Sequence, residues 1–228
     1  MAFKVAIDGP GGAGKSTISK AAARELGFVY IDTGAMYRAL AYVCLSSGIV
    51  ILENEDKCVD VAESADVLIK YFPDGQHVFV NGEDVTGKIR TPEVSMGASE
   101  ISAYGKVRKR LVEIQRGLAE KENVIMDGRD IGTKVLPDAE VKIFLTASAT
   151  VRAKRRFDEL VLKDPNTDFN EVLEDINRRD KNDSTRKESP LMQAEDAILL
   201  DTSDLTLDES ISAVIGIIKD KMGKADKL

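Results

Sequence analysis

A glycine-rich stretch near the start of the chain constrains the fold more than any other feature. It reads Gly9-Pro10-Gly11-Gly12-Ala13-Gly14-Lys15-Ser16-Thr17 and matches the pattern G-x-x-x-x-G-K-[ST] at every fixed position. Residues 3–7 before it form a short β-rich run, and residues 16–26 after it have helical spacing. The stretch therefore predicts a nucleotide-phosphate loop between a strand and a helix of an α/β domain.

Each part of this loop suits a polyphosphate. Glycines let backbone N–H groups turn inward on phosphate oxygens, and the N-terminus of the following helix adds its dipole. Lys15 supplies a positive charge, and Ser16 supplies a hydroxyl ligand for Mg²⁺. An ordinary glycine-rich turn is the alternative, but the match at spaced positions in the required setting argues against it.

Length and charge narrow the class of protein further. The chain has 228 residues, which suits one α/β domain with an insertion, and its formal net charge is -7. This charge argues against a general nucleic-acid or membrane binder, because such proteins need broad positive surfaces. Cys44 and Cys58 lack metal-like spacing and the sequence shows no secretory segment, so we expect a cytoplasmic protein.

Strand-like and helix-like segments alternate along most of the chain. We expect strands at residues 3–7, 28–31, 124–126, 141–145 and 198–200, and helices at residues 16–26, 35–46, 107–120, 150–162, 170–180 and 207–222. This order predicts a largely parallel sheet flanked by helices, as in P-loop NTPases.

The pattern changes between residues 66 and 95. Strand-like runs at residues 67–72 and 77–80 are joined by a turn at Asp74-Gly75, and Asn81-Gly82 follows them. We therefore expect a small antiparallel insert at residues 66–95, mounted on a core formed by residues 1–65 and 96–228.

Two charged clusters follow predicted strands. The first runs from Asp32-Thr33 to Arg38, where Thr33 and a helix terminus can meet an anion. The second is Asp127-Gly128-Arg129-Asp130, at the strand end where open α/β sheets bind ligands. A plain capped helix with a surface arginine is the alternative for the first cluster, and a turn without ligand is the alternative for Asp127.

A third cluster is strongly basic within this acidic chain. It runs Arg178-Arg179-Asp180-Lys181-Asn182-Asp183-Ser184-Thr185-Arg186, and another predicted helix carries Arg152, Lys154, Arg155 and Arg156. Charge runs are usually solvated helix faces. Beside a phosphate loop, however, positioned arginines with Mg²⁺ can stabilise the charge that spreads over a transferred phosphoryl group.

Together these segments resemble the bacterial cytidylate kinases. The resemblance is carried by IDGPGGAGKST, DTGAMYR, DGRDIGTKVLPDAEVKIFLTA and RRDKNDSTR, in family order over nearly the whole chain. It implies a P-loop nucleoside monophosphate kinase that transfers a phosphate from ATP to CMP or dCMP and acts as a monomer. It also implies that residues 66–95 form a monophosphate-binding subdomain and that a lid lies near residues 155–168.

The resemblance also implies which residues contact the acceptor. By this resemblance, the residues around the CMP phosphate are Thr33, Arg38, Arg129 and Arg186. The residues that meet the cytosine base are Ser99, Arg108 and Asp130, and those at the ribose side are Arg179 and Asp183. Cytosine offers an amino donor and ring acceptors, so the Asp130 carboxylate and the Arg108 guanidinium read complementary edges. We therefore expect a preference for CMP and dCMP over UMP.

The expected mechanism relies on positioning. ATP lies on residues 9–17, and Ser16 and Asp127 hold Mg²⁺. A phosphomonoester is mostly dianionic at neutral pH because its second pKa is near ~6, so no general base is needed and His77 receives no role. The residues expected to act in catalysis are Lys15, Arg129, Arg155, Arg179 and Arg186.

Two other functions stay open from the residues alone. One is a P-loop kinase for another monophosphate or a small molecule, and the other is a nucleotide-dependent switch or binding module. A GTPase has weak support, because the chain lacks an N-K-x-D run and its D-x-x-G match at Asp84-Val85-Thr86-Gly87 falls inside the expected insert.

Overall fold

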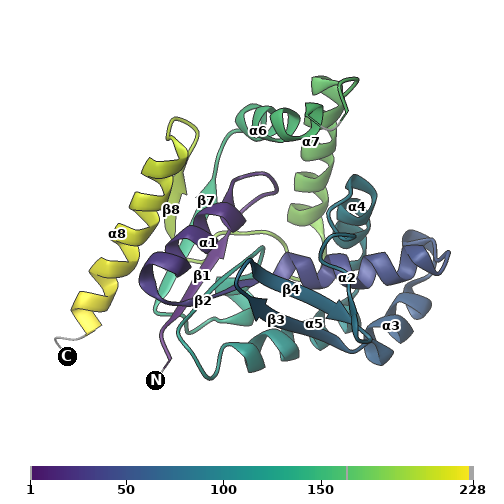
Figure 1. Ribbon diagram of the computed structural model, residues 1–228, viewed down its shortest axis with the longest axis horizontal. Helices are drawn as coiled ribbons and strands as arrows, with labels where there is room; N and C mark the ends of the chain where they lie inside the picture. Colours follow the sequence, from purple (N-terminus) through teal and green to yellow (C-terminus); the bar gives the residue numbers. More distant parts are fainter. Residues whose placement is uncertain (1, 163, 226–228) are drawn as a thin grey trace. The chain divides into compact units, whose positions relative to one another are not determined.

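The computed structural model describes residues 2–162 and 164–225, and the chain divides into two compact units (Figure 1). The phosphate-loop unit comprises Met1–Tyr30, Glu122–Thr185 and Ser189–Leu228. The helix-rich unit comprises Ile31–Lys121 and Arg186–Glu188. Within the described residues, no helix is both long and apolar enough to cross a membrane.

A five-stranded sheet carries the phosphate loop. Its strands follow the order β2-β6-β1-β7-β8 and span Val29–Asp32, Val124–Gly128, Lys4–Asp8, Val141–Thr146 and Ile198–Asp201. The central strand β1 pairs in parallel with β6 and β7, and Asp8 lies opposite Gly128 on one side and Phe144 on the other. Because parallel strands end at the same edge, the segments that follow β1 and β6 emerge side by side.

Helices cover this sheet with apolar side chains. Helices α1 (Lys15–Leu26) and α8 (Leu207–Ala225) pack together, and their buried residues share a core with β1, β6 and β7 (Figure 1). Helices α6 (Ala149–Val161) and α7 (Phe169–Thr185) form a smaller pair around Ala153, Val172 and Ile176. These helices bear the basic clusters of the sequence.

The helix-rich unit is built around α2 (Thr33–Ser46). This helix packs against α3 (Glu55–Ser64), α4 (Pro92–Ile101) and α5 (Gly105–Leu118), and a short 3-10 turn lies at Ile51–Glu53. Met36 and Leu40 on α2 are fully buried with Ile101 and Leu111. This apolar packing fixes the start of α2, where Thr33 lies.

A three-stranded antiparallel sheet belongs to the same unit. Its strands β3 (Val67–Phe72), β4 (Gly75–Val80) and β5 (Glu83–Asp84) pair in chain order. Asn81 and Gly82 join β4 to β5 and both have positive φ, the backbone that a two-residue Asn-Gly hairpin turn requires.

The predicted fold class is confirmed, since a parallel sheet flanked by helices and a small antiparallel sheet are both present. Strands and helices occur at the predicted places, whereas α3, α4 and the π-helical turn Ile131–Val135 were not expected. The boundaries of an inserted subdomain at residues 66 and 95 stay a prediction. Residue 163, within the expected lid, lies outside the described residues.

Candidate active site

The phosphate loop lies between β1 and α1, as its sequence predicts. A Cβ at Gly9 would lie 1.9 Å from the Leu145 carbonyl oxygen of β7, so the backbone at this position touches the neighbouring strand. Gly14 precedes α1 with a φ of 87°, a left-handed conformation that favours glycine. Both glycines are therefore required by the geometry of the loop.

Lys15 is held inside the loop. Its side chain is only 5% exposed, and its Nζ donates a hydrogen bond to the Pro10 carbonyl oxygen at 2.7 Å. Burial and then the nearby Arg129 lower the pKa of Lys15 to about 7, against the opposing effect of Asp127 and Asp8. A phosphate anion bound in the loop would favour the charged lysine.

Ser16 lies beside a carboxylate at the end of β6. Its hydroxyl donates to Asp127 Oδ2 at 2.9 Å, and the Tyr30 hydroxyl donates to Asp127 Oδ1 at 2.9 Å. Hydroxyl and carboxylate oxygens are ligands that Mg²⁺ prefers, usually together with waters and substrate phosphates. This pair of oxygen donors at the helix start therefore fits a magnesium ion.

Asp8 is a site residue that the sequence reasoning missed. Its carboxylate is 5% exposed and accepts the backbone N–H groups of Ile131 and Gly132 at 2.7 and 2.8 Å. Burial raises the pKa of Asp8 to about 6, although both of these hydrogen bonds lower it. Asp8 thus fixes the backbone immediately after Arg129 and Asp130. Its only signal in the sequence is its place at the end of a strand beside the loop.

Two predicted arginines lie beside the loop at Gly11. A Cβ at Gly11 would lie 3.5 Å from Arg129 Nη2 and 3.6 Å from the Cζ of Arg179. Arg129 also donates from its Nε to Asp183 Oδ2 at 2.8 Å. Arg129, Arg179 and Asp183 therefore lie together in the phosphate-loop unit, where Asp130 is also buried.

Three further arginines of the basic clusters, Arg155, Arg156 and Arg178, fall into two groups. Arg155 donates to the Thr202 carbonyl oxygen at 2.8 Å, in the segment after β8. Arg156 and Arg178 pair with carboxylates three residues away on their own helices. These last two contacts match the ordinary solvated helix face.

In the helix-rich unit, Arg38 lies close to the start of its own helix. The Asp32 carboxylate caps α2 by accepting from the Ala35 N–H at 2.9 Å, and it accepts from Arg38 Nη2 at 2.8 Å. Thr33, the first residue of α2, is buried. The same Asp32 carboxylate therefore caps the helix and holds Arg38, which the sequence predicts as an anion ligand.

Ser102 brings together the remaining predicted residues, and sequence reasoning did not single it out. Its hydroxyl donates to the Ser99 carbonyl oxygen at 2.8 Å and accepts from Arg186 Nη1 at 2.9 Å. Its carbonyl oxygen accepts from Arg108 Nη1 at 3.0 Å, while the Arg108 guanidinium lies 5.5 Å from the centroid of the Tyr37 ring. Ser99, Arg108 and Arg186 thus cluster around one serine.

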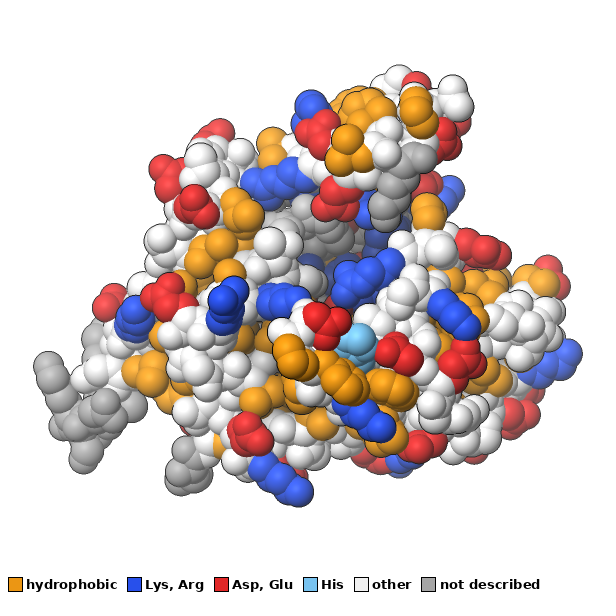
Figure 2. All heavy atoms as spheres, in the orientation of Figure 1, with side chains coloured by type: hydrophobic (Ala, Val, Ile, Leu, Met, Phe, Trp, Pro, Cys, Tyr) orange, Lys and Arg blue, Asp and Glu red, His pale blue; other side chains and the backbone are white. Residues whose placement is uncertain are grey.

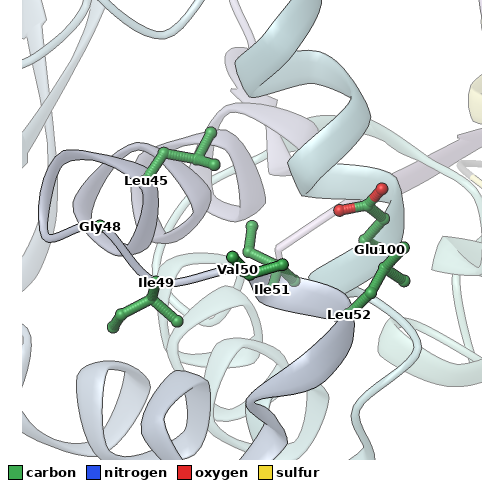
Figure 3. A pocket seen from close by; sticks show the side chains of 7 residues that line it. All are labelled: Leu45, Gly48, Ile49, Val50, Ile51, Leu52 and Glu100. Carbon is green, nitrogen blue, oxygen red and sulfur yellow. The ribbon is translucent and has the colours of Figure 1, made fainter.

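A separate apolar cavity of about 360 Å³ lies in the helix-rich unit (Figure 3). Its lining consists of Leu45, Gly48, Ile49, Val50, Ile51, Leu52 and Glu100. None of these residues belongs to the predicted site, and a mainly apolar lining with one carboxylate does not suit a phosphate.

The fold and the loop define the class of this protein. A glycine-rich loop with a buried lysine joins the central strand to a helix of a parallel α/β sheet, which is the arrangement of P-loop nucleotide-binding enzymes. Beside this loop lie the hydroxyl-carboxylate pair of Ser16 and Asp127 and the two arginines Arg129 and Arg179.

Comparison with known proteins gives the family. The profile of the cytidylate kinase family matches residues 5–220. Cytidylate kinase from Caldicellulosiruptor saccharolyticus is 52% identical over 97% of this chain and 97% of its own length. Cytidylate kinase from Caldicellulosiruptor bescii is 53% identical over 93% of this chain and 94% of its own length. The chain belongs to the cytidylate kinase family.

A solved structure shares the fold at low sequence identity. It is an uncharacterized protein from Eubacterium ventriosum, with a TM-score of 0.53, 14% identity and coverage of 95% of this chain and 98% of that one. This likeness supports the architecture alone.

Proposed function

We propose that this protein transfers the γ-phosphoryl group of ATP to CMP or dCMP, giving ADP and CDP or dCDP. The observation that carries the proposal is the intact phosphate loop, with Lys15 buried inside it and Ser16 bonded to Asp127, in a chain of the cytidylate kinase family. The protein is a nucleoside monophosphate kinase, and a non-catalytic binding module is not favoured.

The donor side of the reaction belongs to residues 9–17. Backbone N–H groups of the glycine-rich loop bind the β and γ phosphates, and Lys15 neutralises part of their charge. Ser16 and Asp127 would hold Mg²⁺, which supplies positive charge against the phosphate oxygens when it is bound.

The residues proposed for the acceptor side are taken from each unit separately. In the phosphate-loop unit the proposed ligands are Arg129, Asp130, Arg179 and Asp183; in the helix-rich unit they are Thr33, Arg38, Ser99, Arg108 and Arg186. A CMP phosphate is dianionic at neutral pH and attacks in line, so these groups align it rather than remove a proton. The Asp130 carboxylate and the Arg108 guanidinium select cytosine over uracil.

Charge stabilisation completes the mechanism. The negative charge of the transferred group spreads over its oxygens, and Lys15, Arg129 and Arg179 carry positive charge at or beside the loop. Arg155 and Arg186 are proposed to join them, with residues 155–168 as a closing segment. The proposal includes a monomer that acts in the cytoplasm.

A substrate panel tests the proposal. Purified protein is assayed for ADP release from ATP and Mg²⁺ with CMP, dCMP, UMP, AMP or no acceptor. We expect ADP release that depends on CMP or dCMP, with UMP used less efficiently. Tight ATP binding without acceptor-dependent ADP would contradict the kinase, and equal turnover of UMP would contradict the assigned base selection.

A further inference from the structure

Gln76 of β4 makes an unusual contact with the residue before α2. Its Oε1 accepts the backbone N–H of Asp32 at 2.9 Å, and its Nε2 donates to the Asp32 carbonyl oxygen at 3.5 Å. One side-chain amide thus bonds both backbone polar groups of a residue 44 positions away in the chain. Both residues belong to the helix-rich unit.

Asp32 in turn holds the start of α2 and the Arg38 side chain. Its Oδ1 accepts the Ala35 N–H at 2.9 Å, and its Oδ2 accepts from Arg38 Nη2 at 2.8 Å. Burial by itself would raise the pKa of the Asp32 carboxyl, but Arg38 and Arg90 outweigh it and lower the pKa. Asp32 is therefore a carboxylate at neutral pH, and it orients the Arg38 guanidinium.

Arg38 has a remaining donor that the described residues do not satisfy. Its Nε is buried and has no hydrogen-bond partner among them. A buried N–H without an acceptor is costly, and an anion that binds beside Arg38 would supply one. The guanidinium is thus held on one side by Asp32 and is ready for an acceptor at its Nε.

We propose that Gln76 is a positioning residue for the acceptor phosphate. By fixing the backbone of Asp32, it fixes the carboxylate that orients Arg38. A free Asp32 backbone would let the carboxylate and the guanidinium shift together, which would lower the affinity for the acceptor. This inference rests on the proposed function, because it takes Arg38 as a ligand of the CMP phosphate.

The neighbouring His77 offers a matched control. Successive side chains of a strand point to opposite faces, so His77 does not share the face of Gln76. Its ring lies between Asp74 and Asp84, at 2.9 and 2.7 Å, and against Phe72. Figure 2 shows the histidine (pale blue) bordered by acidic side chains (red) and hydrophobic ones (orange). A change at His77 perturbs the same strand without touching Asp32.

The experiment compares Gln76→Met with His77→Phe in steady-state assays. Gln76→Met keeps the length of the side chain and removes both hydrogen bonds. We expect the KM for CMP to rise about three- to tenfold, as for the loss of one or two hydrogen bonds, with the KM for ATP unchanged. His77→Phe should leave both constants at their wild-type values. Equal KM changes in both variants, or a parallel rise in the KM for ATP, would overturn the proposal.

A double-mutant cycle tests whether Gln76 acts through Arg38. The value of kcat/KM for CMP is the slope of the rate per enzyme against the CMP concentration at low CMP. It can therefore be measured even when CMP binds weakly. In an Arg38→Ala background, Gln76→Met should have little further effect. The full single-variant effect in that background would refute a route through Arg38. Absence of CMP-dependent turnover in the wild type would instead refute the proposed function, which separates the two failures.

Discussion

In the phosphate loop, consecutive residues from Gly9 to Thr17 carry the chemistry, whereas the residues proposed for the acceptor are spread from Thr33 to Arg186. The loop is shaped by backbone conformation, as the positive φ of Gly14 shows. The proposed acceptor residues are instead oriented by side-chain hydrogen bonds: Arg38 donates to Asp32, and Arg186 donates to Ser102. A local motif therefore accounts for the proposed donor site, whereas the proposed acceptor site draws on residues that lie far apart in the sequence.

The largest effect is expected from the loop itself. Lys15→Ala should lower kcat by about 100- to 1000-fold, because it removes a preorganised charge from the transferred phosphoryl group. The measurement is ADP release at saturating ATP and CMP. Lys20→Ala, an exposed lysine of the same helix, is the control and should stay near wild type. A Lys15→Ala enzyme with wild-type turnover would remove the loop from the mechanism.

The next effect is expected at Asp8, the residue before the loop, and it concerns the pH dependence of the unfolding free energy. The folded pKa of Asp8, about 6, exceeds the ordinary 3.8, so its contribution to stability is present below about pH 4 and is lost as the pH rises to 6. The unfolding free energy of wild type relative to Asp8→Asn should fall by roughly 3 kcal/mol from pH 4 to 7. Urea unfolding across this range measures it, and parallel curves for the two proteins would contradict the expectation.

A residue of the dispersed set gives a smaller effect that is specific to the base. Asp130→Asn should reduce the preference for CMP over UMP by about tenfold, because the amide offers a donor where the carboxylate only accepts. The test compares kcat/KM for both nucleotides. Asp138→Asn, an exposed carboxylate in the same segment, serves as the control. Retained discrimination in Asp130→Asn would place base selection elsewhere.

The smallest effect is expected at His77, outside both regions. Hydrogen bonds to Asp84 and then Asp74 raise its pKa above 6.5. The added stability is therefore present below pH 6.5 and is lost as the pH rises through the folded pKa. Between pH 6 and 8, the wild-type melting temperature should fall slightly relative to that of His77→Phe, because the ion pairs of this exposed group are screened by water. A change in CMP turnover in His77→Phe would show that His77, and not only Gln76 on the same strand, affects the acceptor site.

The loop and the sheet were predictable because their signals are local. The strand-loop-helix order follows from residues 3–26, and the Asn81-Gly82 turn requires only two residues. Helix α4 was not expected from the sequence. In the structure Pro92 lies in the first turn, after Thr91 caps the helix by accepting from the Val94 N–H. A proline at that position is compatible with a helix, since no N–H is needed there.

The anchoring residues were not predictable in the same way. Asp8 bonds the backbone of Gly132 across 124 positions of sequence, and Gln76 bonds Asp32 across 44. Neither contact leaves a spacing pattern, because it depends on which strands become neighbours. The roles of the acceptor residues themselves stay predictions, supported by resemblance and by the clustering within each unit.

Arg152 connects three segments of the phosphate-loop unit through hydrogen bonds. Its guanidinium donates to the Gly11 carbonyl oxygen, to the Ala147 carbonyl oxygen before α6 and to the Asp180 carboxylate on α7. A tilt of α7 that preserves these bonds must carry the phosphate loop with it. The position of the phosphate loop is thereby linked to the position of a helix that begins at Phe169, more than 150 residues later in the chain.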